Sequence, residues 1–186
     1  MTGYGFASQS PRFEQQTRHS KDDALTDHEF EKLYESAQRL DDEYYSLQCM
    51  FVVYVAGRLG LRRGEIGHME KSWVDFDEKM IYIPRHVDCD CGNCRQKAKQ
   101  KVKHNEHIEF EEAMNNRWHP KTEASIREVP FGFSARAEVL LERYFDRFDE
   151  FTDSMNAVNR RVNRAAEHCD GIKRDEIYPH ALRATA

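Results

Sequence analysis

The sequence predicts a mainly α-helical fold with a small antiparallel β-sheet, which belongs to the α+β class. Three observations lead to this prediction. Apolar residues recur at helical intervals through most of the chain, β-rich runs are few and short, and no internal repeat is visible. The length of 186 residues suits one compact domain and leaves little room for a second.

The first folded element is predicted by a capping signal. Residues 1–20 mix Gly, Ser, Gln and isolated aromatic residues without a period, so we expect a disordered or extended lead-in before a domain over 21–186. Thr26 followed by Glu29 has the spacing of a capping box, in which the Thr hydroxyl accepts a hydrogen bond from a helical amide. The apolar residues that follow at helical intervals predict an amphipathic helix.

The next elements are a buried helix and a hairpin. The second helix begins near Asp42 and is apolar on nearly all sides over 47–56, which predicts burial at the centre of a helical bundle. A short helix over 63–69 follows. Two β-rich runs, 74–78 and 80–83, then predict a small hairpin.

A long polar insertion interrupts the β-rich part of the chain. It covers roughly residues 85–117 and precedes another β-rich run at 125–129. Lys121 lies shortly before that run, and we expect it at the tip of a hairpin turn.

Three helices are predicted after the sheet. Ser134 caps the first, which has Val139 on its apolar side. Ser154 opens the second, and Gly171 stops it. Pro179 suits the first turn of the third, because a residue there has no intrahelical partner for its amide hydrogen.

The charge distribution bears on the partner of this protein. The chain has 28 Lys and Arg against 33 Asp and Glu, and its net charge of −5 taken alone argues against nucleic acid, since phosphate binding relies on basic side chains. The basic residues are nevertheless clustered, at Arg58 with Arg62 and Arg63, at 95–103, and at 160–174. We therefore expect an acidic surface around a local basic groove.

Membrane insertion is not predicted. The longest strongly apolar run, 49–56, is far shorter than the ~20 residues that a membrane span needs, and no basic-then-apolar leader opens the chain. These observations predict a soluble intracellular protein with no membrane partner.

The insertion contains a possible metal site. Cys89, Cys91 and Cys94 bring three thiols within six residues around a turn-forming Gly-Asn pair, which is typical of a zinc knuckle. The fourth ligand is left open, and the nearby histidines are His86, His104, His107 and His119. The alternative is reduced free thiols in a mobile loop. With zinc, the basic run 95–103 would be held toward a DNA backbone; without it, the run is a solvated charged face.

Several motifs together resemble a known family. They are Gly60-Leu61-Arg62-Arg63-Gly64-Glu65-Ile66, Trp73 before the hairpin, Pro120-Lys121-Thr122, Arg127-Glu128-Val129-Pro130, and Pro179-His180-Ala181-Leu182-Arg183. In order and spacing they resemble the catalytic domain of the tyrosine recombinases, or phage integrases, over about residues 25–186. The resemblance implies a double-stranded DNA partner, assembly of four protomers on DNA, and site-specific recombination or integration.

The resemblance also implies roles for four residues. Arg62 and Arg183 would stabilise the charge that develops on a phosphodiester under attack, because guanidinium groups stay protonated and bind two oxygens at once. His180 would donate to the phosphate or shuttle a proton, and Lys121 would protonate the departing 5′ oxygen. In the family a tyrosine forms a 3′-phosphotyrosyl link and no metal is required. The plainer alternatives are an Arg62–Glu65 surface ion pair, a solvated Lys121, and His180 as an N-terminal helix residue with no further role.

The family's nucleophilic tyrosine follows the H-x-x-R helix, whereas only Ala184, Thr185 and Ala186 follow it here. We therefore expect a catalytic domain that stops before its nucleophile and does not cleave DNA alone, in a cytoplasmic, nucleoid-associated protein. Two alternatives remain, a truncated DNA-binding relic without cleavage activity and a zinc-stabilised protein-interaction domain. Type IB topoisomerases use a related set of residues.

Overall fold

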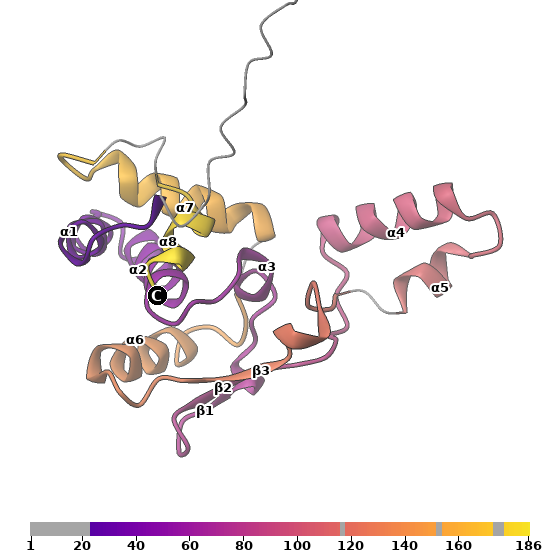
Figure 1. The fold of residues 1–186 in the computed structure, drawn as a ribbon, viewed down its shortest axis with the longest axis horizontal. Helices are drawn as coiled ribbons and strands as arrows, with labels where there is room; N and C mark the ends of the chain where they lie inside the picture. Colours follow the sequence, from indigo (N-terminus) through magenta and orange to yellow (C-terminus); the bar gives the residue numbers. More distant parts are fainter. Residues whose placement is uncertain (1–22, 116–117, 152–153, 173–176) are drawn as a thin grey trace, which may run out of the picture.

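The computed structural model describes residues 23–115, 118–151, 154–172 and 177–186. The predicted lead-in over 1–20 lies outside the described residues. Helices pack into a body with a three-stranded sheet along one side, and two further helices project from this body as an arm (Figure 1). The predicted fold class is confirmed. No helix in these ranges combines the length and apolar character needed to cross a membrane.

The body is built around α2 (Glu43–Gly57), whose residues from Ser46 to Gly57 are all buried. Around α2 lie α1 (Asp27–Gln38), α6 (Ala135–Phe145), α7 (Met155–Glu167) and α8 (Pro179–Ala184). Because α2 is apolar on all sides, it is stable only when other helices cover it, as the sequence predicts. Phe51 of α2 stacks on Tyr144 of α6 with ring centroids 3.7 Å apart.

Side chains cap the starts of α1 and α2, at α1 through the predicted capping box. At α1, the amide of Glu29 donates to the Thr26 hydroxyl at 3.3 Å, and the Glu29 carboxylate accepts from the Thr26 amide at 2.8 Å. At α2, the Asp42 carboxylate accepts from the amide of Tyr45 at 3.1 Å. These side chains satisfy amide groups that have no partner inside the helix.

The sheet consists of β1 (Val74–Asp75), β2 (Met80–Ile83) and β3 (Arg127–Pro130), paired antiparallel in that order. Ile81 of β2 lies opposite Val129 of β3, and both are buried. Short 3₁₀ turns precede two of the strands, Lys71–Trp73 before β1 and Glu123–Ser125 before β3. The sheet therefore connects residues near 81 with residues near 129, on either side of the insertion.

The insertion forms the arm, with α4 (Gly92–His104) packed on α5 (Phe110–Met114). The sequence analysis left this segment without helices. Three of its buried residues, Ala98, Ala113 and Met114, form a small cluster with partly buried Val102 and Ile108, whereas buried Cys94 belongs to the large core of the body. At the base of the arm, Val87 and Trp118 exchange backbone hydrogen bonds of 3.0 and 3.3 Å.

Several local predictions differ from the structure. The short helix α3 covers only Arg63–Ile66, and α7 ends at Glu167, before Gly171. Val139 of α6 is 62% exposed, because the neighbouring apolar residues Leu140 and Leu141 already face the core. The arm lies between the paired strands β2 and β3, so Lys121 is not at the tip of a tight hairpin.

Candidate functional site

A groove of about 690 Å³ runs between α3, α8, α7 and the segment before β3. It brings together all four residues to which the sequence analysis gave catalytic roles, although they are far apart in the chain. These residues are Arg62, Lys121, His180 and Arg183. We call this space the phosphate groove, after the role expected of these four residues from the sequence. Its other lining residues are Arg63, Gly64, Thr122, Asn159, Tyr178 and Pro179.

Glu65 organises the arginines at the floor of this groove. It is 1% exposed. Its carboxylate accepts from the backbone amide of Arg62 at 2.7 Å and from the Arg62 guanidinium at 2.9 Å. Arg127 of β3 donates to both Glu65 oxygens, each at 2.9 Å. The plainer alternative of an Arg62–Glu65 ion pair is therefore present, but the carboxylate is buried and shared with Arg127.

Gly60 links the same region to α8. Its carbonyl oxygen accepts from Nε of Arg183 at 2.9 Å and from Arg127 at 3.2 Å. Gly60 has φ of +66°, in the left-handed region that side chains with a Cβ rarely adopt. This turn therefore aims one carbonyl at two arginines, from β3 and α8, and fixes where Arg183 lies.

The charges in this region do not balance. Arg62, Arg127 and Arg183 surround the single carboxylate of Glu65, and within the described part of the chain no carboxylate forms an ion pair with Arg183. The exposed side chains of Lys121 and Arg63 add further positive charge at the groove. Such a surplus of fixed cations at a solvent-accessible groove favours the binding of an anion.

Two pKa shifts accompany this arrangement. Burial opposes ionisation of Glu65, but the hydrogen bonds from Arg127 and Arg62 outweigh it and lower the pKa of its carboxyl group. Burial lowers the pKa of Arg183, and the positive charge of Arg62 adds to this effect. A guanidinium group still remains protonated near neutral pH.

His180 and Lys121 complete the set from two further elements. His180 lies three residues before Arg183 in α8, so both side chains reach the same face of this helix. The position of α8 is fixed by hydrogen bonds to the start of the fold, where Tyr178 donates to Asp23 and the Leu25 amide donates to the Thr185 hydroxyl at 3.0 Å. Lys121 and His180 are both exposed, so solvent or a ligand can reach them.

Sequence reasoning missed two residues at the phosphate groove. Arg127 was part of a quoted motif but had no role, and the structure pairs it with Glu65. Asn159 of α7 lines the groove, and its buried Oδ1 has no hydrogen-bond partner among the described residues. A single asparagine in an amphipathic helix does not indicate a binding site, so the sequence carried no signal for the position of Asn159 in the groove.

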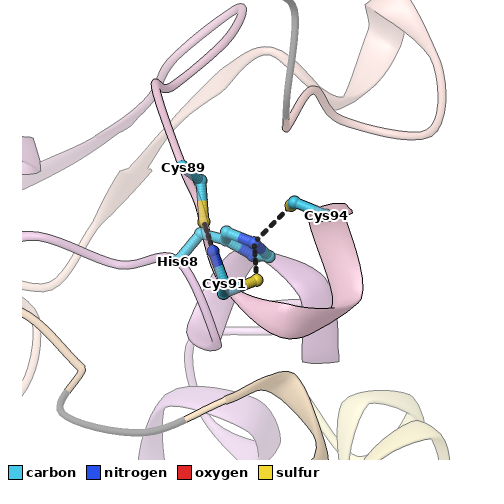
Figure 2. A group of neighbouring side chains, drawn as sticks. All are labelled: His68, Cys89, Cys91 and Cys94. Carbon is cyan, nitrogen blue, oxygen red and sulfur yellow. Dashed lines mark hydrogen bonds between the residues drawn. The ribbon is translucent and has the colours of Figure 1, made fainter. Parts of the chain in front are cut away.

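The phosphate groove lies at the N-terminal end of α3, and a second group of side chains lies just beyond its C-terminal end. Cys89, Cys91 and Cys94 approach His68, and the four potential ligand atoms all lie within 4.8 Å of one another (Figure 2). Nε2 of His68 is 3.3 Å from Sγ of Cys94 and 3.6 Å from Sγ of Cys91. A group of three cysteines and one histidine with this spacing has the composition of a tetrahedral metal site.

The fourth member of this group differs from the histidines considered in the sequence analysis. His86 and His119 line a separate groove beneath the arm, His104 ends α4, and His107 lies in the connection to α5. His68 precedes the sheet and the whole insertion. Only the folded chain brings it beside the cysteines, so the local spacing from which the cysteines were identified carried no signal for it.

Burial and hydrogen bonds shift the pKa values of this cluster in different directions. It raises the pKa of the Cys94 thiol well above its usual range and lowers the pKa of His68. At Cys91 burial also acts to raise the pKa, but hydrogen bonds from the Cys94 amide and from neighbouring thiols outweigh it, and the pKa is lowered. The cluster thus combines a neutral imidazole with one thiol that ionises more readily than its neighbours.

Comparisons with known proteins identify the fold. No protein-family model matches the sequence, and no curated protein matches it. Among solved structures, the chain is similar to the crystal structure of XerA recombinase, with a TM-score of 0.55 and 16% sequence identity. The similarity covers 94% of this chain and 50% of that one, so the chain spans about half the length of the structure it matches.

Proposed function

We propose that this chain is the phosphate-binding part of the catalytic domain of a tyrosine recombinase, an enzyme that cleaves and rejoins double-stranded DNA at specific sites. One observation carries the proposal. Three motifs that are distant in the sequence supply Arg62, Lys121 and the pair His180–Arg183, and all of them line one groove with a surplus of positive charge. The fold of a recombinase catalytic domain supports the same function.

The proposed chemistry follows from the charges. A tyrosine hydroxyl of the complete recombinase gives its proton to His180 and attacks a DNA phosphorus, a phosphotyrosyl bond forms, and the bond to the 5′ oxygen breaks. Arg62 and Arg183 stabilise the negative charge on the non-bridging oxygens, where guanidinium groups donate in pairs. His180 donates a hydrogen bond to the same phosphate, and Lys121 gives its proton to the leaving oxygen. The proposed reaction needs no metal ion.

The proposed binding of phosphate by Arg62 and Arg183 is tested by DNA binding of the 186-residue chain. Binding to a fluorescent duplex is measured by anisotropy over a series of salt concentrations, for the wild type, Arg62→Ala, Arg183→Ala and the double variant. We expect each single variant to weaken binding and to reduce the salt slope by about 0.9, the value for one neutralised phosphate. Because both arginines are proposed to bind the same phosphate, the loss of affinity in the double variant should be smaller than the sum of the losses in the two single variants.

Arg39→Ala is the matched control, because Arg39 forms an exposed surface pair with Glu35. Equal weakening in this control and in the groove variants would contradict the proposal, as would additive effects in the double variant. A nicked duplex provides the second test. A covalent protein–DNA adduct would assign strand cleavage to this chain itself. Binding without an adduct is expected both when the attacking tyrosine belongs to the rest of a complete recombinase and for the second candidate, DNA binding without cleavage.

A further inference from the structure

We propose that His68, Cys89, Cys91 and Cys94 bind one Zn²⁺ ion, and that this ion fastens the α4–α5 arm to the body just beyond the end of α3. The inference goes beyond the proposed DNA chemistry, because it concerns a different group of residues and a structural role. His68 comes from the body, whereas the three cysteines come from the start of the arm (Figure 2). A bound ion would therefore join two parts of the chain that are distant in sequence.

The spacing of the ligand atoms fits a tetrahedral zinc site. Zn–S bonds of about 2.3 Å and a Zn–N bond of about 2.0 Å, at tetrahedral angles, place the nitrogen about 3.5 Å from each sulfur. The observed distances from Nε2 of His68 are 3.3 Å to Cys94 and 3.6 Å to Cys91. Two of the three nitrogen–sulfur separations that the ion requires are therefore already present, and all four ligand atoms lie within 4.8 Å of one another.

The hydrogen bonds of His68 prepare its ring for a metal. Nδ1 lies 2.7 Å from the carbonyl oxygen of Gly64. A carbonyl only accepts, so Nδ1 carries the proton and Nε2 presents a lone pair toward the sulfurs. This is the usual arrangement of a zinc-bound histidine, whose second nitrogen donates to a backbone carbonyl and fixes the ring orientation.

Two of the thiols approach the same acceptor nitrogen. The single lone pair on Nε2 accepts only one hydrogen at a time, yet two sulfurs approach it, and Cys94 is 2% exposed. The Cys91 amide lies 3.4 Å from Sγ of Cys89 and donates to it, as amides do to metal-bound thiolates. A cation among the sulfurs would satisfy all of these atoms together.

The arm needs an anchor of this kind. Its own apolar cluster contains only Ala98, Ala113 and Met114 as buried residues, which is too little to stabilise a two-helix unit. At its base, the Trp118 ring stacks on His68 with centroids 5.0 Å apart. The zinc site would thus lie where the arm meets the body, and fixing it there would fix the direction of the arm.

The ligand set selects the metal and its role. Three sulfurs and one imidazole nitrogen in tetrahedral geometry suit Zn²⁺ rather than Mg²⁺ or Ca²⁺, which prefer oxygen ligands. Four protein ligands leave no position for water or substrate, and this is the pattern of structural zinc sites. The ion is therefore a support for the fold and takes no part in the DNA chemistry.

The first test is the zinc content of the full chain. The protein is supplied with zinc, dialysed against metal-free buffer and measured by metal analysis. We expect one zinc per chain in the wild type, loss of bound zinc in Cys94→Ser, and full retention in Cys169→Ser, which changes another buried cysteine outside the cluster. Well under one zinc per wild-type chain, or equal loss in the two serine variants, would overturn the proposal.

The second test assigns His68 as a ligand. Co²⁺ replaces zinc and gives visible bands of tetrahedral coordination together with thiolate-to-metal charge-transfer absorption. His68→Ala should weaken metal binding by more than the roughly 10–100-fold cost of losing an outer partner. His68→Cys should restore tight binding and increase the charge-transfer intensity by a fourth thiolate. Unchanged affinity in His68→Ala, or no change of spectrum in His68→Cys, would contradict the assignment.

The third test concerns the arm. Trypsin cleaves after Lys and Arg, and α4 contains five such residues between Arg95 and Lys103. We expect a chelator to make α4 much more sensitive to trypsin in the wild type and to have no effect in Cys94→Ser. Equal cleavage with and without chelator in the zinc-loaded wild type would show that zinc does not hold the arm to the body. Arg62→Ala should bind zinc normally, so a failure of the DNA proposal leaves this result unaffected.

Discussion

Glu65 is the residue on which the arginines of the phosphate groove depend. It is the buried carboxylate that holds both Arg62 and Arg127, from α3 and β3. A buried carboxylate is costly unless its charge is compensated, and here four hydrogen bonds would weaken together if its charge were removed. The two arginines would then repel each other and Arg183 more strongly.

We expect Glu65→Gln to lower the free energy of unfolding by about 1–3 kcal/mol at pH 7, the usual effect of impairing buried hydrogen bonds to a charged group. The folded state lowers the pKa of Glu65. Its ionised form therefore stabilises the fold above the unfolded pKa of about 4.3, and this contribution is lost as the pH falls below that value toward the folded pKa. The difference between wild type and variant should shrink in acid.

Urea unfolding at pH 7 and below pH 4 measures this difference. Glu35→Gln is the control, since Glu35 forms only an exposed pair with Arg39 and should have almost no effect at either pH. A wild-type advantage over Glu65→Gln that stays constant between the two pH values would show that the charge of Glu65 is not the source of its effect.

The sequence predicted the residues of the phosphate groove better than those of the cysteine cluster, for a physical reason. His180 and Arg183 are one helical turn apart, and Arg62 stands in a compact motif, so local spacing was informative. His68 and Cys94 meet only because the sheet returns the chain to the end of α3. A contact made by folding over such a distance leaves no periodic signal in the sequence.

At the scale of elements, the same contrast separates the body from the arm. Helices α1, α2 and α6 of the body were predictable because each carries a face or a whole surface of apolar residues and a capping side chain. Helix α4 carries mostly Lys, Arg and Gln, and only Ala98 and Cys94 are buried in it. With so few apolar residues, its hydrophobic pattern did not distinguish a helix from a polar loop.

The arm also extends the basic surface beyond the phosphate groove. Lys97 and Lys101, one turn apart on α4, line the groove beneath the arm together with His119. Lys121, two residues after His119, lines the phosphate groove. The short segment 119–121 thus borders both grooves, and a DNA strand that crosses it would meet positive charge on either side.

We therefore expect the double variant Lys97→Gln, Lys101→Gln to weaken DNA binding and to reduce the salt slope by up to about 0.9 for each phosphate that is no longer neutralised. The matched control is Lys99→Gln, Lys103→Gln, which removes the same charge from the same helix at exposed positions that do not line the groove. Anisotropy titrations at several salt concentrations give both slopes. Equal effects of the two pairs would mean that only total charge matters, against a directed interaction of Lys97 and Lys101 with DNA.

At the scale of the whole molecule, the described residues form two separate apolar cores of very different size. The large core joins α1, α2, α6, α7, the sheet and α8 and reaches Cys94 at the start of α4, whereas the rest of the arm contributes the small cluster around Ala98. Buried apolar area is the main source of stability, so the two parts should open independently. The Val87–Trp118 bridge and the cysteine cluster join the arm to the large core, to which Trp118 and Cys94 belong.

We expect hydrogen exchange to report this division directly. Amides of α2 should exchange only through global unfolding, because its residues from Ser46 to Gly57 are all buried. Amides in the second half of α4 should exchange at least roughly tenfold faster, through local opening of the arm.

Helix α6 is the internal comparison, since it is similar in length to α4 but packs on the large core, and its exchange should follow that of α2. Mass spectrometry of peptic peptides measures all three. Equal protection of α4 and α2 would mean that arm and body form one cooperative unit, and that the small core around Ala98 is not the limit on the stability of the arm.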